Sequence, residues 1–239
     1  MKIVKVILYQ KPLGSEIPDK DINEINDFKP HFICFPEYFF IDTKSTNHTT
    51  QTTENQEKQI RRIKLLSKNT DSIVIGGTMP EISGNKLYNT CFIFNRGNIL
   101  GFYRKKNLFF AEEGRIMPGD KYKVFSAYGI KFGILICADV LNNEIFKFMK
   151  KNKAKIIFSP TFSPKREESV DEKFKRDNYI YVNGAKQSSA VIVKVCCVKS
   201  KYMENLQARS LIANSEGIIF RVNPHEEDKS LIIKKEIEI

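Results

Sequence analysis

The chain has 239 residues, 41% of them hydrophobic, and a formal net charge of +11 at pH 7. This size and apolar fraction predict a single domain over residues 1–239, and no apolar stretch is long enough to span a bilayer. The positive charge would suit a nucleic-acid-binding protein, but acidic residues are interleaved with the lysines, and no basic segment alternates with stacking aromatics. The N-terminus also lacks the small-residue cleavage site of a signal peptide. We therefore expect a cytoplasmic protein with neither a nucleic acid nor a membrane as its partner.

Short apolar runs alternate with amphipathic segments along the chain, which predicts an α/β fold. The predicted strands are rich in Ile, Val and Phe and end at Gly, Pro, Asn or Asp. They span residues 4–10, 31–36, 71–77, 88–95, 98–105, 130–137, 154–160 and 189–198. Turn residues predict hairpins at FNRGNIL (94–100) and ANSEGII (213–219), so the sheets should be mixed rather than purely parallel.

Apolar residues at helical spacing predict three helices, over 55–69, 141–152 and 170–188. Either Asn142 or Asn143 should cap the second of them. The segment 43–56 is polar and rich in threonine, which predicts a surface loop rather than a domain boundary.

The cysteines and histidines follow no disulfide or metal-site pattern. The number of cysteines is odd, no CxxC pair occurs, and no histidine lies at ligand spacing from a cysteine or another histidine. We expect reduced thiols, no metal and no cofactor. Cys34, Cys91, Cys196 and Cys197 suit a hydrophobic core. Cys137 ends the apolar run of GILICADV (133–140), where it is either one more core residue or a nucleophile.

Three predicted strands end in reactive side chains, and chemistry in α/β folds usually lies beyond strand ends. Glu37 follows HFICFP, Lys105 ends NILGFYRK, and Cys137 ends IKFGILIC. An ammonium would lower the pKa of a neighbouring thiol and stabilise an oxyanion, while a carboxylate could move the thiol proton. These three groups would suffice for acyl transfer without histidine. Sequence separation alone leaves simpler alternatives open, because Lys106 is a rival for Lys105 and Glu37 could merely cap a helix.

The ordered set FPEYFF, YRKKNLFF and GILICADV resembles the nitrilase superfamily, the carbon–nitrogen hydrolases. Residues 74–108 look like the central stretch of that family, and ARSLIANSEGII (208–219) is similar to one of its late strand pairs. The resemblance covers nearly the whole chain. It implies a four-layer α-β-β-α sandwich with mixed sheets, paired as a homodimer or assembled into a higher homo-oligomer. It also implies hydrolysis of a small amide or N-carbamoyl compound through a cysteine thioester.

The resemblance assigns catalytic roles to individual residues. Cys137 is implied as the nucleophile, Glu37 as the general base and Lys105 as the stabiliser of the oxyanion. A further glutamate would position Lys105 and the substrate, and the spacing to MPGD in the family implies Glu112 rather than Glu113.

The resemblance also implies residues around the substrate. Ala138 would donate its backbone N–H to the oxyanion, while Tyr38, Asp139 and Thr161 would line or support the pocket. Ala138 stands where the family often has an aromatic residue, which should reshape the pocket floor. A catalytically silent binding or assembly protein is the alternative, and a true nitrilase is less favoured than an amidase.

Overall fold

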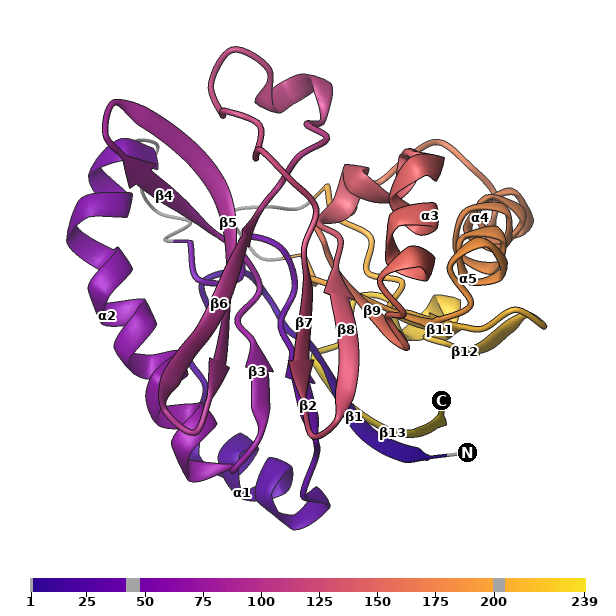
Figure 1. The fold of residues 1–239 in the computed structure, drawn as a ribbon, viewed down its shortest axis with the longest axis horizontal. Helices are drawn as coiled ribbons and strands as arrows, with labels where there is room; N and C mark the ends of the chain where they lie inside the picture. Colours follow the sequence, from indigo (N-terminus) through magenta and orange to yellow (C-terminus); the bar gives the residue numbers. More distant parts are fainter. Residues whose placement is uncertain (1, 42–47, 200–204) are drawn as a thin grey trace.

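The computed structural model describes residues 2–41, 48–199 and 205–239. Two mixed β-sheets pack face to face, and helices cover both outer faces, so the fold is the four-layer α-β-β-α sandwich that the sequence implied (Figure 1). Helices α1 (Asp19–Phe28) and α2 (His48–Asn69) lie on one side, and α3 (Asn143–Lys151), α4 (Val170–Asp177) and α5 (Asn183–Ser188) lie on the other.

The first sheet has seven strands in the order β13-β1-β2-β3-β5-β4, with β6 also paired to β5. Its strands are β1 (Ile3–Gln10), β2 (Phe32–Cys34), β3 (Ile73–Ile75), β4 (Met79–Ser83), β5 (Lys86–Asn95), β6 (Asn98–Arg104) and β13 (Leu231–Glu238). β1, β2 and β3 pair in parallel, whereas the remaining pairs are antiparallel. Because β1 pairs with β13, the two chain termini lie together (Figure 1).

The second sheet has six strands in the order β12-β11-β10-β9-β8-β7. Its strands are β7 (Val124–Ala127), β8 (Ile130–Ile134), β9 (Ile156–Thr161), β10 (Val191–Cys196), β11 (Leu211–Ala213) and β12 (Ile218–Arg221). β8, β9 and β10 are parallel. Three strands lead directly into the site described below. Glu37 follows β2, Cys137 follows β8, and Phe162 follows β9.

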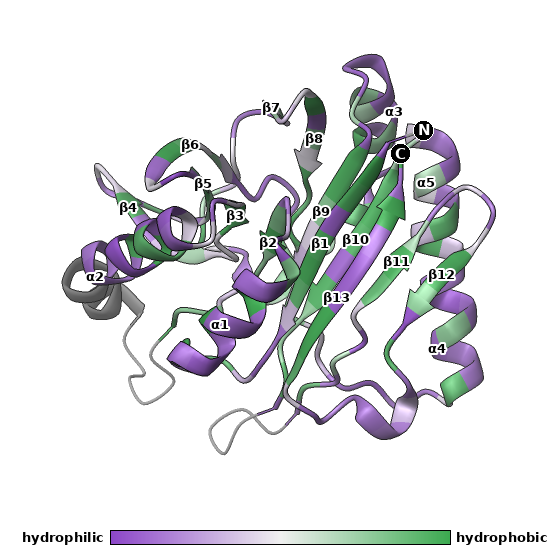
Figure 2. Cartoon of the chain, turned by 90° about the horizontal axis from the view of Figure 1, so that it is seen from below, coloured by the Kyte–Doolittle hydropathy of each residue, from purple (hydrophilic) through white to green (hydrophobic). Residues whose placement is uncertain are grey.

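The core has three layers because strand side chains alternate between faces. In β1, Val6 and Leu8 face the second sheet, while Ile7 and Tyr9 pack on the α1 and α2 side. Phe32 bridges the two sheets, with its ring centroid 5.2 Å from that of Phe132. Figure 2 shows the apolar strands in the interior and helices with polar outer faces.

The structure contains most of the strands, hairpins and helices predicted from the sequence, and it differs from the prediction at a few segments. Both hairpins form, and the side chain of Asn142 accepts from the N–H of Glu144, which identifies Asn142 as the cap of α3. The predicted loop at 43–56 is wrong for residues 48–56, which belong to α2, and residues 43–47 lie outside the described part. Helix α1 and strands β4, β7 and β13 were not predicted individually, since their apolar patterns are short or interrupted.

The third predicted helix, 170–188, is helical throughout, but it consists of two α-helices with a π-helical turn between them. α4 is capped by the Ser169 side chain, and a single π-helical turn (Asn178–Val182) joins it to α5. Such π turns often occur at functional sites. In the part of the chain that the structure describes, no helix combines the length and apolar composition needed to cross a membrane.

Candidate active site

Cys137 lies at a sharp turn between the two sheets. Strand β8 ends at Ile134, three residues earlier than predicted, and a 3-10 helix (Cys137–Leu141) begins at the cysteine. The backbone of Cys137 has φ +45° and that of Tyr38 has φ +58°, a left-handed conformation that is uncommon for residues other than glycine. Backbone strain of this kind is often found at functional sites, and both residues line the cavity described below.

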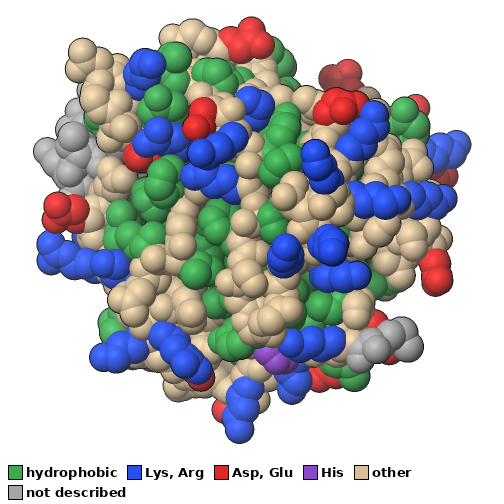
Figure 3. Space-filling view, in the orientation of Figure 1, with side chains coloured by type: hydrophobic (Ala, Val, Ile, Leu, Met, Phe, Trp, Pro, Cys, Tyr) green, Lys and Arg blue, Asp and Glu red, His purple; other side chains and the backbone are tan. Residues whose placement is uncertain are grey.

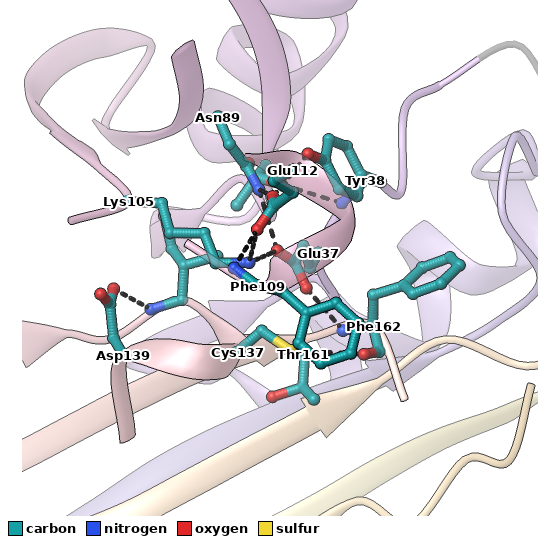
Figure 4. A network of polar contacts seen from close by, with 12 residues as sticks. Glu37, Tyr38, Asn89, Lys105, Phe109, Glu112, Cys137, Asp139, Thr161 and Phe162 are labelled. Carbon is teal, nitrogen blue, oxygen red and sulfur yellow. Dashed lines mark hydrogen bonds and ion pairs between the residues drawn. The ribbon is translucent and has the colours of Figure 1, made fainter. Parts of the chain in front are cut away.

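Lys105 lies between two carboxylates. Its Nζ is 2.8 Å from Glu37 Oε1 and 2.6 Å from Glu112 Oε2 (Figure 4). The side chains of Lys105 and Glu37 are only 2% and 1% exposed, so the three charges interact with little screening by water. Lys106, the alternative to Lys105 that the sequence left open, does not contact these carboxylates and donates instead to the backbone carbonyl of Asp120.

Backbone and amide donors complete this network. Asn89 Nδ2 donates to Glu37 Oε1 and to Glu112 Oε1, each at 2.9 Å. The Phe162 N–H donates to Glu37 Oε2 at 2.8 Å, and the Tyr38 hydroxyl donates to Glu112 Oε1 at 2.9 Å. The sequence assigned no role to Asn89, although it lies in the Tyr-Asn-Thr strand that carried part of the resemblance.

The thiol of Cys137 lies beside this network, with Sγ 3.3 Å from the carbonyl oxygen of Phe162. Cys137 is partly exposed, whereas the other four cysteines are buried. It opens into a cavity of about 290 Å³ that is also lined by Glu37, Lys105 and Glu112. The structure thus brings together the four residues that the resemblance named for catalysis.

The residues expected around the substrate divide into two groups. Tyr38, Ala138 and Thr161 line the cavity. Asp139 does not, because it is fully buried and accepts hydrogen bonds from the N–H groups of Asn107 and Ile136 at 2.8 and 2.9 Å. Asp139 therefore supports the turn at Cys137 from beneath rather than contacting a substrate.

A family model described as carbon-nitrogen hydrolase matches residues 22–237. The chain belongs to the carbon-nitrogen hydrolase family. The match includes every residue of the network and both sheets, apart from β1 and the last residue of β13.

Curated relatives of this carbon-nitrogen hydrolase match it in part. The omega-amidase NIT2 of Xenopus tropicalis is 31% identical over 136 residues, which are 51% of this chain and 49% of the relative. The nitrilase homolog 2 of Dictyostelium discoideum is 28% identical over 153 residues, which are 59% of this chain and 47% of the relative. The chain thus spans about half the length of the curated relatives it matches.

Solved structures agree with the fold over almost the whole chain. A carbon-nitrogen hydrolase from Helicobacter pylori G27 has a TM-score of 0.83 at 18% identity, covering 99% of this chain and 90% of that chain. An amidase from Nesterenkonia sp. AN1 has a TM-score of 0.79 at 15% identity, covering 98% of this chain and 90% of that chain.

Electrostatics distinguish Glu112 and Lys105 from the thiol in this carbon-nitrogen hydrolase. Burial would raise the pKa of Glu112, but the charge of Lys105 and the hydrogen bonds from Lys105, the Phe109 N–H and Asn89 outweigh it and lower the pKa. Burial likewise opposes the charge on Lys105, yet the neighbouring Glu37 carboxylate raises the pKa of Lys105 above its usual value. Both groups are therefore charged at neutral pH.

Opposing influences act on the pKa of the Cys137 thiol. Burial and then the negative charge of Glu37 raise the pKa of Cys137 well above its usual value, although Lys105 does lower it in part. Lys105 thus acts on the thiol pKa in the expected direction, but burial and Glu37 outweigh it. Cys137 is a protonated thiol at neutral pH, and it needs a base to take its proton before it can attack.

Proposed function

We propose that the protein hydrolyses small amides through a thioester on Cys137. The observation that supports this most directly is that a partly exposed thiol and a lysine held between two buried carboxylates open into one small cavity. A protonated thiol needs a base, and Glu37 is held beside it. The Phe162 N–H donates to Glu37, and the Phe162 carbonyl oxygen accepts from the Cys137 thiol. Glu37 then acts as the general base and Cys137 as the nucleophile.

The reaction proceeds in two halves. Glu37 takes the proton of Cys137, and the sulfur forms a bond to the amide carbon. Lys105 and the N–H of Ala138 stabilise the resulting oxyanion, since the first N–H groups of a helix have no intrahelical acceptor. Protonated Glu37 gives its proton to the leaving nitrogen, the C–N bond breaks, and ammonia departs. Glu37 next takes a proton from water, and the water oxygen attacks the thioester carbon. The C–S bond breaks, the acid leaves, and protonated Glu37 returns its proton to the Cys137 sulfur.

Glu112 has a positioning role in this scheme. Its Oε1 accepts from Tyr38 and Asn89, and its Oε2 accepts from the Phe109 N–H and binds Lys105. A carboxylate with four donors is poorly suited to accept a further proton. Glu112 therefore fixes the Lys105 ammonium at the position where the oxyanion develops.

The cavity and the relatives favour an amide as substrate. A volume of about 290 Å³ lies near the lower end for ligand pockets, which favours a small molecule. One curated relative is an omega-amidase, and a mutant of the Nesterenkonia amidase carries the acetamide moiety of fluoroacetamide covalently at its active-site cysteine. An N-carbamoyl compound would follow the same chemistry.

The same proposal includes the location, the domain organisation and the oligomeric state of the protein. We place the protein in the cytoplasm, treat residues 1–239 as one domain, and expect a homodimer, as the family resemblance implied. Figure 3 shows lysine and arginine side chains spread over the face in view, with acidic side chains among them, and this spread fits a solvated surface better than a nucleic-acid site.

Ammonia release from a panel of short aliphatic amides tests the proposal. Cys137→Ala should abolish release, with a loss of at least about 1,000-fold, while Cys196→Ala should retain it. Mass spectrometry of protein quenched during turnover should find the acyl group on the Cys137 peptide. Amide hydrolysis that persists in Cys137→Ala would remove this residue from the mechanism, and a silent wild-type protein would favour the binding role.

A further inference from the structure

The connection between β3 and β4 lies against the turn that carries Glu37. Strands β2 and β3 are parallel, and just beyond β2 the Phe35 N–H donates to the carbonyl oxygen of Ile75 at 3.0 Å. Past this hydrogen bond one chain enters the Glu37 turn, and the other passes through Gly77 and Thr78 into β4. Neither Gly77 nor Thr78 lines the cavity, so the connection supports the site from outside it.

Gly77 makes the closest approach to this turn. It has φ +61°, and a Cβ atom at this position would lie 2.3 Å from the carbonyl oxygen of Pro36 and 3.1 Å from Phe35 Cβ. Both the backbone conformation and the lack of space therefore require glycine. The close approach brings the next residue, Thr78, within hydrogen-bond distance of the backbone at Tyr38.

Thr78 binds the backbone of Tyr38 through its side chain. Thr78 is fully buried, and its Oγ1 accepts from the Tyr38 N–H at 2.9 Å. Among the described residues, no backbone carbonyl accepts from this N–H, so the Thr78 hydroxyl is its acceptor. Tyr38 has φ +58°, a conformation that a residue with a side chain keeps only where its surroundings hold it.

Tyr38 in turn affects both carboxylates that contact Lys105. It follows Glu37 directly in the chain, so a change in its backbone conformation would move the Glu37 carboxylate. Its hydroxyl donates to Glu112 Oε1 at 2.9 Å. Its ring packs on Phe162, with centroids 6.3 Å apart, and the Phe162 N–H binds Glu37 Oε2.

We propose that Thr78 is a positioning residue, which holds Tyr38 in its left-handed conformation and so places Glu37 and Glu112 on either side of Lys105. The proposal rests on the amidase function above and adds a residue that lies outside the cavity. A displacement of about 1 Å at a catalytic group can lower the rate about 100-fold, so a hydrogen bond behind the turn can affect catalysis. Serine at position 78 would keep the acceptor, whereas valine has a similar shape but removes it.

The kinetics of two substitutions at Thr78 test this role. Thr78→Val should lower kcat by about 10- to 100-fold and leave KM within about threefold of the wild type, because the cavity lining is unchanged. Thr78→Ser should keep kcat within about threefold of the wild type, because its hydroxyl still accepts from Tyr38. A wild-type kcat in Thr78→Val, or equal losses in both variants, would overturn the proposal.

Thr70→Val is the matched control. Thr70 is also buried, and its hydroxyl donates to the carbonyl oxygen of Leu66 at 2.8 Å, at the end of α2 and outside the cavity lining. This variant should lose thermal stability and keep the wild-type kcat. Circular dichroism checks that each variant is folded, and where Thr78→Val does not fold, Thr78→Ala removes the same acceptor.

Alkylation of Cys137 tests the positioning role without a substrate. The charge of Glu37 raises the pKa of the Cys137 thiol, so a Glu37 carboxylate that has moved away should let iodoacetamide react at lower pH. We expect this shift in Thr78→Val and the wild-type profile in Thr78→Ser and Thr70→Val. A shift in a protein that hydrolyses no amide would support the role of Thr78 while the hydrolase mechanism fails. An unshifted profile in Thr78→Val would overturn the role of Thr78 and leave the amidase function intact.

Discussion

Glu37 and Glu112 share one ammonium group and one amide group. Lys105 Nζ contacts Oε1 of the first and Oε2 of the second, and Asn89 Nδ2 donates to Oε1 of both. Two buried carboxylates at this separation would repel each other strongly without a cation between them. The Lys105 charge thus stabilises the folded site as well as any oxyanion formed there.

Replacing Lys105 should therefore damage both catalysis and stability. In Lys105→Met, kcat should fall by about 1,000-fold because the oxyanion loses its charged donor. The free energy of unfolding should fall by about 3–5 kcal/mol because two buried carboxylates lose their counter-ion. Ammonia release and urea denaturation measure the two effects. Lys106→Met is the matched control, and a larger effect there would contradict the assignment of Lys105.

Asn89 should act as a positioning residue. In Asn89→Leu, kcat should fall about 10- to 100-fold, since hydrogen bonds to charged groups are worth ~1.5–3 kcal/mol. The pKa of Glu112 should rise because it loses a donor, which moves the acidic limb of the kcat/KM profile to higher pH. Asn95→Leu, at the other end of β5, should leave the profile in place. A loss of stability with an unshifted profile would indicate a purely structural role.

Glu112 and Glu113 are adjacent but differ in environment. Glu112 accepts from Tyr38, Asn89 and the Phe109 N–H, whereas Glu113 is exposed. Glu112→Gln should lower kcat by about 100-fold, because its amide nitrogen would face a donor and shift Lys105. Glu113→Gln should stay within about twofold of the wild type, as exposed sites usually do. Steady-state kinetics of both variants measure these losses of kcat, and equal losses would contradict the positioning role of Glu112.

The reactivity of Cys137 should depend on pH in a defined direction. Burial and the charge of Glu37 raise its pKa, so the thiolate forms, and iodoacetamide reacts faster, as the pH rises above neutrality. Glu37→Gln removes a negative charge and should move the midpoint of this profile to lower pH. Lys105→Met removes a positive charge and should move it to higher pH. Peptide mass spectrometry follows the label, and the four buried cysteines serve as slow internal controls.

Asp139 should be important for the turn that presents Cys137. Besides three backbone N–H groups it accepts from the Tyr103 hydroxyl at 2.9 Å. Asp139→Ala leaves these buried donors unpaired and should lower the free energy of unfolding by about 3 kcal/mol or more. Thermal and urea denaturation measure this, with Asp120→Ala as the exposed control. Unchanged stability would show that other acceptors replace the carboxylate.

The sequence predicted most strands because apolar β-branched and aromatic runs bounded by turn residues depend on local chemistry. It also predicted the order of the reactive residues, since Glu37, Lys105 and Cys137 each follow an apolar run. The prediction from the sequence was wrong where a helix or strand lacks a clear periodic pattern of apolar residues. The threonine-rich residues 48–56 have no apolar face that would separate a helix from a loop, and β8 ends at Ile134, before the positive-φ turn at Cys137 that the apolar run did not reveal.

The sequence alone determined the family, the sandwich fold and a short list of reactive residues, because these depend on residue type and order. Only the tertiary structure brings Glu37 and Lys105, 68 positions apart, within 2.8 Å, since strand pairing joins segments that are distant in the chain. The same is true of Asn89, whose side-chain amide lies between the two carboxylates. The raised pKa of Cys137 was also decided by the fold, because burial and the nearness of Glu37 outweigh the lysine that the sequence emphasised.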